Sequence, residues 1–98
     1  MLTISTFAMV LAAASPSPPP KLGLCASCHG ANGIAVLPAH PHLAGQDEAY
    51  LRAALAAYRN GARQHAPMQA AVGVLSEAEL DALARYFASL PRDGGEPR

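Results

Sequence analysis

The strongest constraint on the fold lies at residues 25–30, which read Cys-Ala-Ser-Cys-His-Gly. Two cysteines separated by two residues and followed at once by a histidine form the attachment pattern of a covalently bound c-type haem. In that chemistry the two thiols add across the vinyl groups of the porphyrin and become thioethers. One turn of backbone spans the vinyls, and the adjacent histidine can then ligate the iron through a ring nitrogen.

Three other interpretations of this motif are weaker. A zinc site needs two further ligands at ordered spacing, but the chain has no third cysteine, and His40, His42 and His65 form no suitable pair. A thioredoxin-like dithiol needs βαβ surroundings, and no strand pattern flanks the motif. A disulfide across so short a loop would stabilise little. We therefore expect a haem.

The composition supports a large apolar cofactor. The length of 98 residues predicts one domain. Large aromatic side chains that could fill its core are scarce, with no Trp, 3 Tyr and 2 Phe. A domain of this size buries only about 60–65 % of its unfolded surface and is marginal without a staple. A haem would supply the missing apolar bulk. The formal net charge is +0, so steering toward nucleic acid or an acidic membrane surface is not indicated, and a docking partner is expected to meet an apolar contact with a mixed rim.

The first residues of the chain predict export. Residues 1–14 form an apolar run that is too short for a membrane-spanning helix, which needs about 17–25 residues. The run fits a signal peptide with an A-x-A cleavage site at residues 12–14, although no Lys or Arg precedes it. An uncleaved anchor, a start codon further upstream and a buried N-terminal helix are the alternatives. We expect a periplasmic protein whose membrane contact, if any, is made through this leader.

The remainder divides into three parts. Residues 15–20 (Ser-Pro-Ser-Pro-Pro-Pro) are a stiff spacer, residues 21–91 the folded domain, and residues 92–98 a flexible polar tail. Because proline is tolerated in a first helical turn, a short helix can start at Pro19 or Pro20 and enter the cysteine motif.

Residues 31–43 lack periodicity and contain glycine and prolines, so they predict a loop. Four apolar loop residues are candidates for haem contact: Ile34, Val36, Leu37 and Leu43.

A helix is expected over residues 46–60, capped by Gly45 or Asp47 and stopped by Gly61. Its apolar face would comprise Tyr50, Leu51, Ala54, Leu55 and Tyr58.

The second long helix is expected over residues 76–90. Ser76 and Glu79 form a capping box, and Pro91 ends the helix. Its apolar stripe comprises Leu80, Leu83, Ala84, Phe87 and Leu90.

The intervening residues 64–74 are predicted as a loop containing Met68, the only methionine outside residues 1–14. Alone, Met68 would be a gap-filling apolar residue. Beside a Cys-x-x-Cys-His motif it becomes a candidate second axial ligand, because a six-coordinate haem needs one. A thioether sulfur is soft, favours reduced iron and raises the potential.

Taken together, the residues resemble the class I c-type cytochromes, especially the small soluble bacterial monohaem proteins. The similarity extends over about residues 21–90. It rests on four stretches in order: residues 25–33; residues 41–46 with Tyr50-Leu51 and residues 58–63; Met68; and Leu75-Ser76 with Glu79-Leu80 and the helix up to Tyr86-Phe87.

The resemblance implies an all-α cytochrome c fold, with three or four helices around one covalent haem c and its iron. It implies thioether bonds at Cys25 and Cys28, with His29 and Met68 as the axial metal ligands. It also implies that the Pro41 carbonyl accepts the His29 ring N–H, which fixes the ligand's tautomer.

Three further residues match the segment that approaches the haem propionates in this family, without one being singled out: Tyr58, Arg59 and Arg63. Two departures from the family pattern stand out. The proline spacer shortens the first helix, and His65 lies close to the expected ligand Met68.

The expected function is one-electron transfer between redox partner proteins, without enzymatic activity. Two alternatives remain. The domain could be a haem subunit of a larger dehydrogenase or oxidase complex, or a ligand-binding or sensing haem protein in which Met68 is displaced. A bis-histidine haem that uses His65, His40 or His42 would change only the ligation.

Overall fold

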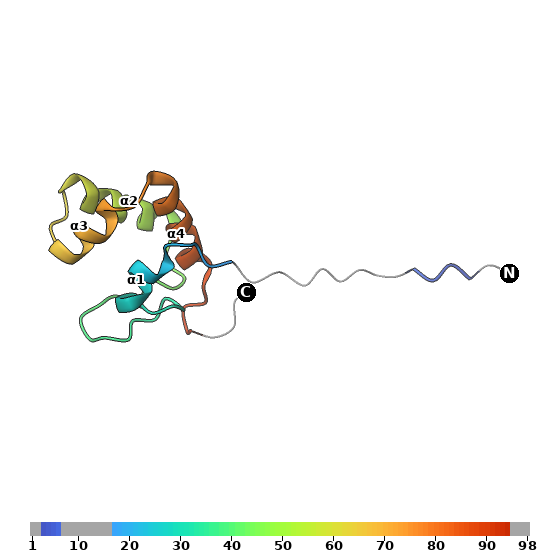
Figure 1. Ribbon diagram of the computed structural model, residues 1–98. Coiled ribbons are helices and arrows are strands. Elements are labelled where there is room, and N and C mark those ends of the chain that lie inside the picture. Colours follow the sequence, from blue (N-terminus) through green and yellow to red (C-terminus); the bar gives the residue numbers. More distant parts are fainter. Residues whose placement is uncertain (1–2, 7–16, 95–98) are drawn as a thin grey trace.

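The computed structural model describes residues 3–6 and 17–94, and these residues contain helices but no strand. The helices are α1 (Leu22–His29), α2 (Glu48–Asn60), α3 (Ala66–Gly73) and α4 (Glu77–Ser89) (Figure 1). The predicted all-α architecture is thereby confirmed. Most of the expected leader and residues 95–98 lie outside the described residues. No helix in the described part of the chain is long and apolar enough to cross a membrane.

Helix α4 forms the centre of the fold. Its start has the predicted capping box: the Glu79 N–H donates to Ser76 Oγ at 3.1 Å, and the Ser76 N–H donates to Glu79 Oε1 at 3.0 Å. The bond from the Ser76 N–H lowers the pKa of the Glu79 carboxyl. All members of the predicted apolar stripe are buried in one cluster, namely Leu80, Leu83, Ala84, Phe87 and Leu90.

Helix α2 packs against α4 and begins two residues later than predicted. Asp47 is extended, with φ −60° and ψ 130°, and its Oδ1 accepts the Tyr50 N–H at 2.8 Å, so the helix starts at Glu48. The apolar face is narrower than expected. Leu51 is buried, but Tyr50 is 52 % exposed. The helix stops at Gly61, whose φ of +83° is left-handed, as the sequence predicts.

Helix α3 corrects the prediction of a loop over residues 64–74. Pro67 lies in the first helical turn, where its missing N–H is not needed and its fixed φ suits the helix. The Gln69 side chain also accepts the His65 N–H at 3.2 Å. Val72 near the other end of the helix is buried, which anchors α3 in the core.

Helix α1 starts at Leu22, just after the prolines, and its first N–H donates to the Pro19 carbonyl at 3.0 Å. Close helix packing joins α2 to α4 and α2 to α3, whereas α1 packs loosely on the other helices. Figure 1 accordingly shows α1 and the segment that follows it on one side, below the other three helices.

The segment between α1 and α2 is a closed loop, as predicted. The N–H groups of Leu43 and Ala44 both donate to the Gly33 carbonyl, at 2.8 and 3.0 Å. Gly33 has a φ of +78°, and a Cβ there would lie 2.8 Å from the Ala44 Cβ. Both the backbone conformation and the close approach therefore require glycine at this position.

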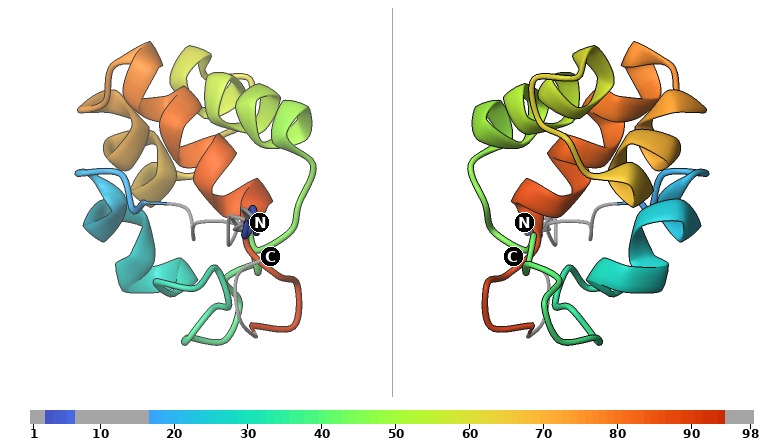
Figure 2. Two further views of the ribbon diagram at one scale, coloured as in Figure 1. Left: turned by 90° about the vertical axis from the view of Figure 1, so that its right-hand side faces the viewer. Right: turned by 90° about the vertical axis from the view of Figure 1, so that its left-hand side faces the viewer.

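The last turn of α4 and the chain beyond it bind the end of this loop, which Figure 2 shows beside the C-terminal segment. The Gly45 N–H donates to the Phe87 carbonyl at 3.0 Å, and Arg92 Nε donates to the Gly45 carbonyl at 3.0 Å. The tail expected to be flexible from residue 92 therefore begins with a residue that is hydrogen-bonded into the fold.

Candidate functional site

His29 is the most informative side chain of the candidate site. It ends α1, is only 6 % exposed, and its Nδ1 lies 2.9 Å from the carbonyl oxygen of Pro41. Because a carbonyl can only accept, Nδ1 must carry the proton, and the lone pair of Nε2 is left available for a metal. The histidine and its acceptor are the pair that the family resemblance names.

The two cysteines lie on α1, one turn apart, on the approach to His29. Both are half-buried free thiols. Burial raises the pKa of the Cys25 thiol, which favours its neutral form. Two thiols on one turn, followed by an imidazole that is already oriented, are the donor set that covalent haem attachment requires.

Met68 lies on α3, is partly buried against the core, and lies near His29. The Met68 side chain thus comes from α3, whereas the His29 imidazole comes from α1. His65, the nearby alternative, is an exposed residue at the start of α3.

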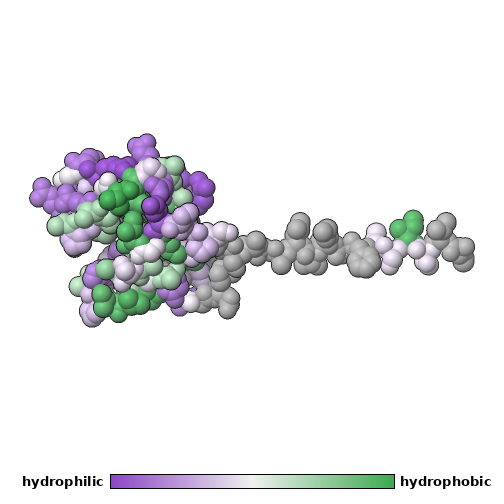
Figure 3. All heavy atoms as spheres, in the orientation of Figure 1, coloured by the Kyte–Doolittle hydropathy of each residue, from purple (hydrophilic) through white to green (hydrophobic). Residues whose placement is uncertain are grey.

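The surroundings of these donors are apolar and only partly covered. Half-buried side chains from α1, the loop, α2 and α3 adjoin the core, among them Leu22, Cys25, Ile34, Leu43, Leu55, Tyr58 and Met68. Figure 3 shows apolar surface running between the polar upper helices and the lower part of the molecule. Because α1 packs loosely, a flat apolar group between it and the other helices would complete the burial of these side chains. The residues therefore fit a haem.

The loop residues proposed for haem contact divide into two pairs. Ile34 and Leu43 are half-buried and pack against the core. Val36 and Leu37 are 68 % and 49 % exposed. The sequence pattern could not separate the pairs, because which side chain turns inward depends on how the loop closes.

All three residues considered for the propionates have other contacts. Arg59 Nη2 donates to the carbonyls of Leu75 and Val72, the latter at 3.4 Å, so it ties α2 to the turn between α3 and α4. The Arg63 guanidinium lies 4.8 Å from the centre of the Tyr58 ring, a cation–π contact.

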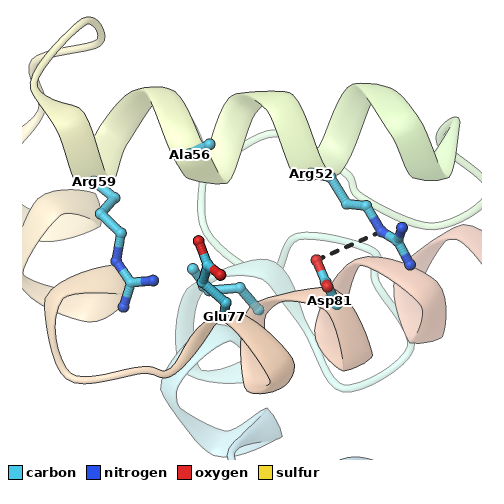
Figure 4. Close-up of a pocket in the computed structure, with 6 residues that line it drawn as sticks. Arg52, Ala56, Arg59, Glu77 and Asp81 are labelled. Carbon is cyan, nitrogen blue, oxygen red and sulfur yellow. Dashed lines mark ion pairs between the residues drawn. The ribbon is translucent and has the colours of Figure 1, made fainter.

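Arg59 also borders a pocket of about 200 Å³ between α2 and α4, drawn in Figure 4. Both positively and negatively charged side chains line it, together with two apolar ones. The lining residues are Arg52, Ala56, Arg59, Glu77, Leu80 and Asp81. Arg52 Nε lies 3.6 Å from Asp81 Oδ1. The cysteines, His29 and Met68 do not line this pocket, so it is separate from the candidate haem site.

His42 has a contact that the sequence did not reveal. Its Nδ1 accepts the N–H of Ala35 at 2.7 Å, across the loop. The ring of His40 lies edge-on to that of His29, with 6.0 Å between the ring centres. No sequence signal pointed to either contact, because both depend on the path of the loop.

A helical fold with a Cys-x-x-Cys-His motif ending its first helix and a methionine on the third defines a class I c-type cytochrome. Residues 23–91 match the cytochrome c family, and the chain belongs to that family. Membership implies one covalent haem c with its iron, and it supports haem-based electron transfer.

Relatives bear out this assignment. Cytochrome c-554(548) of Halomonas halodenitrificans is 36 % identical over 72 residues, which cover 70 % of this chain and 87 % of that protein. The thiosulfate dehydrogenase electron acceptor of Thiomonas intermedia is 40 % identical over 77 residues, covering 78 % of this chain and 36 % of the relative.

Among solved structures, reduced recombinant cytochrome c4 from Pseudomonas stutzeri matches with a TM-score of 0.63 and 32 % identity. The match covers 68 % of this chain and 38 % of the cytochrome c4 chain. The chain thus spans little more than a third of cytochrome c4 and of the thiosulfate dehydrogenase electron acceptor, but most of cytochrome c-554(548).

Proposed function

We propose that this chain is a one-electron carrier with a haem joined to Cys25 and Cys28 and axially ligated by His29 and Met68. The observation that carries the proposal is the buried imidazole beside two free thiols, with its Nδ1 2.9 Å from the Pro41 carbonyl. This contact supports the proposal because it leaves the lone pair of Nε2 free, which is the tautomer that can ligate iron. The folded domain is taken as residues 21–91.

When bound, the haem iron supplies a one-electron couple between its ferric and ferrous states. Residues of the protein would tune the reduction potential of that couple. The Pro41 carbonyl makes the His29 imidazole a stronger electron donor, which favours ferric iron. The Met68 thioether is a soft ligand, which favours ferrous iron. With His29 and Met68 both bound to the iron, small ligands would be excluded.

The partner surface that we propose surrounds the cysteines. Residues 22–46 contain no Asp, Glu, Lys or Arg, and three apolar side chains are exposed there, Leu24, Val36 and Leu37. A redox partner would meet an uncharged apolar surface. Because salt screens only charges, the rate of electron transfer through it should depend weakly on ionic strength.

A second candidate function is a haem relay inside a larger redox assembly. It is favoured by the relatives named as electron acceptors of thiosulfate dehydrogenase, of which this chain matches about a third. Co-purification of the chain with a large dehydrogenase subunit would favour this role over that of a free carrier. We further propose export to the periplasm, on the basis of the apolar residues 1–14.

The deciding experiment is an optical spectrum of the purified exported protein together with its intact mass. We expect the mass of one added haem, a six-coordinate low-spin spectrum and a methionine-to-ferric-iron charge-transfer band. Met68→Ala should abolish the band and lower the reduction potential, whereas His65→Ala should leave both unchanged. A band that survives Met68→Ala would refute the ligand assignment, and carbon monoxide binding to the resting ferrous wild type would favour a sensor.

A further inference from the structure

The loop between α1 and α2 contains a side-chain bond whose position suggests a role. The Ala35 N–H donates to Nδ1 of His42 at 2.7 Å. A backbone N–H can only donate, so Nδ1 of His42 must carry the lone pair, and the ring proton lies on Nε2. The bond joins the outgoing limb of the loop to its returning limb.

Hydrogen bonds hold the two ends of this loop, and just before Pro41 the His40 ring lies edge-on to the His29 ring while its Nδ1 lies 3.3 Å from the Pro38 carbonyl. The Gly33 carbonyl accepts from Leu43 and Ala44 at its base, and Gly45 is bound by Phe87 and Arg92 beyond it. Pro41 lies between the base and the tip. Its carbonyl must nevertheless hold a fixed direction, because it lies 2.9 Å from the His29 ring.

His42 is placed to fix that direction. The carbonyl of Pro41 and the N–H of His42 belong to one planar peptide unit. The plane can rotate only if the Cα of Pro41 or of His42 moves or the adjoining dihedral angles change. The bond from the His42 ring to Ala35 holds the side chain of His42, and the bond from the Leu43 N–H to the Gly33 carbonyl holds the next peptide unit. With both of these substituents of its tetrahedral Cα held, the backbone nitrogen of His42 is restrained, and rotation of the plane would have to move that nitrogen. The ring thereby acts on the carbonyl without touching the metal ligand itself.

We infer that His42 is a positioning residue for the axial ligand His29, acting through the Pro41 carbonyl. The inference rests on the proposed function, since His29 is a ligand only if the chain carries a haem. A well-aligned carbonyl strengthens the imidazole as a donor and favours ferric iron. Loss of the His42 bond should therefore weaken the contact between His29 and Pro41 and raise the reduction potential.

Two substitutions of similar size separate the bond from the bulk of the ring. In His42→Asn the side-chain oxygen lies the same number of bonds from the backbone as Nδ1 of histidine, so the acceptor is retained. In His42→Leu a methyl group takes that place and the acceptor is lost. Both are compared in the haem-loaded protein, for the reduction potential and for hydrogen exchange of the His29 ring N–H by NMR.

We expect His42→Leu to raise the potential and to speed exchange of the His29 ring proton about fivefold, the effect of losing one ordinary hydrogen bond. His42→Asn should stay close to the wild type. If His42→Leu does not fold, His42→Ala, which also lacks an acceptor, is compared with His42→Asn instead. Equal potentials and equal exchange rates in the variants with and without an acceptor would overturn the inference.

The wild-type spectrum separates this outcome from failure of the proposed function. An intact methionine-to-iron band in the wild type, with no difference between the two His42 variants, would refute the role of His42 alone. Absence of the band in the wild type would refute the axial assignment of Met68. The exchange rate of the His29 ring proton still reports on His42 in that case.

Discussion

Arg59 illustrates how a family pattern and a local contact can compete for one side chain. The family pattern places it in the segment near the propionates, but its guanidinium donates to backbone carbonyls of Leu75 and Val72. Those carbonyls lie where α3 ends and the chain turns toward α4. A donor at the C-terminal end of a helix satisfies carbonyls that have no partner within the helix.

Replacement of Arg59 by methionine should therefore weaken the fold rather than alter the redox centre. Methionine keeps the apolar stem but lacks the donors, so the free energy of unfolding should fall by about 1 kcal/mol. The reduction potential should not change. Chemical denaturation and redox titration of Arg59→Met, with Arg63→Met as the control, provide the test. A shifted potential in Arg59→Met with unchanged stability would contradict it.

At Gly33 the addition of a single atom, a Cβ, should have a large effect on stability. An added Cβ would lie 2.8 Å from Ala44, and the φ of +78° is unfavourable for other residues. Gly33→Ala should lower the free energy of unfolding by about 1–3 kcal/mol, measured by chemical denaturation.

Gly23 offers a matched control, since nothing lies within 4 Å of a Cβ there and it is inside α1. Gly23→Ala should leave stability unchanged or raise it by about 0.5–1 kcal/mol, because alanine favours a helix. Equal effects of the two substitutions would show that the Gly33 turn is not strained.

At the level of elements, the caps show what decides where a helix begins. Ser76 and Glu79 each satisfy an N–H at the start of α4. Ser76→Ala removes one acceptor and should lower the free energy of unfolding by about 1 kcal/mol, measured by thermal or chemical denaturation. Ser89→Ala, at the opposite end of α4, is the matched control.

The capping box of Ser76 and Glu79 should also make the free energy of unfolding depend on pH. The Ser76 N–H lowers the pKa of Glu79 in the folded state, below the value of 4.5 for the free group. The carboxylate therefore stabilises the fold above that value, and the contribution disappears as the pH falls through the lowered pKa. The stability difference between wild type and Glu79→Gln should shrink between neutral pH and about pH 3. A difference that is constant over this range would rule out the ionised carboxylate as its source.

The elements also show how far sequence reasoning reaches. Helices α2 and α4 were predictable because Asp47, Ser76 and Gly61 are strong local signals and the apolar spacing is regular. Helix α3 was not, because it has eight residues, no amphipathic pattern and a proline in its first turn. Its helical state depends on anchoring Val72 in a core that only the tertiary fold creates.

For the molecule as a whole, the Cys-x-x-Cys-His motif predicted the cofactor and the family. The contacts of His42 and Arg59 could not be predicted, because both bonds join residues that loop closure or helix packing brings together. Local patterns therefore point to the candidate donors of the site, but they do not reveal contacts such as those of His42 and Arg59.

Removal of the cofactor should affect the molecule unevenly. Close packing among α2, α3 and α4 does not involve α1, which adjoins the core through half-buried residues. In the double variant Cys25→Ala/Cys28→Ala, which cannot form thioethers, hydrogen exchange should accelerate much more in α1 than in α4, and the melting temperature should fall. Ser27→Ala, between the cysteines, serves as the control. Equal acceleration in both helices would mean that α1 belongs to the cooperative core.

The loose packing of α1 also has a consequence for the order of haem attachment and folding. The other three helices have a buried core in common, so they can come together while the thiols of Cys25 and Cys28 remain within reach of an attachment enzyme. Maturation and folding then need not obstruct each other. The segment that must be modified is the one whose docking can be left until last.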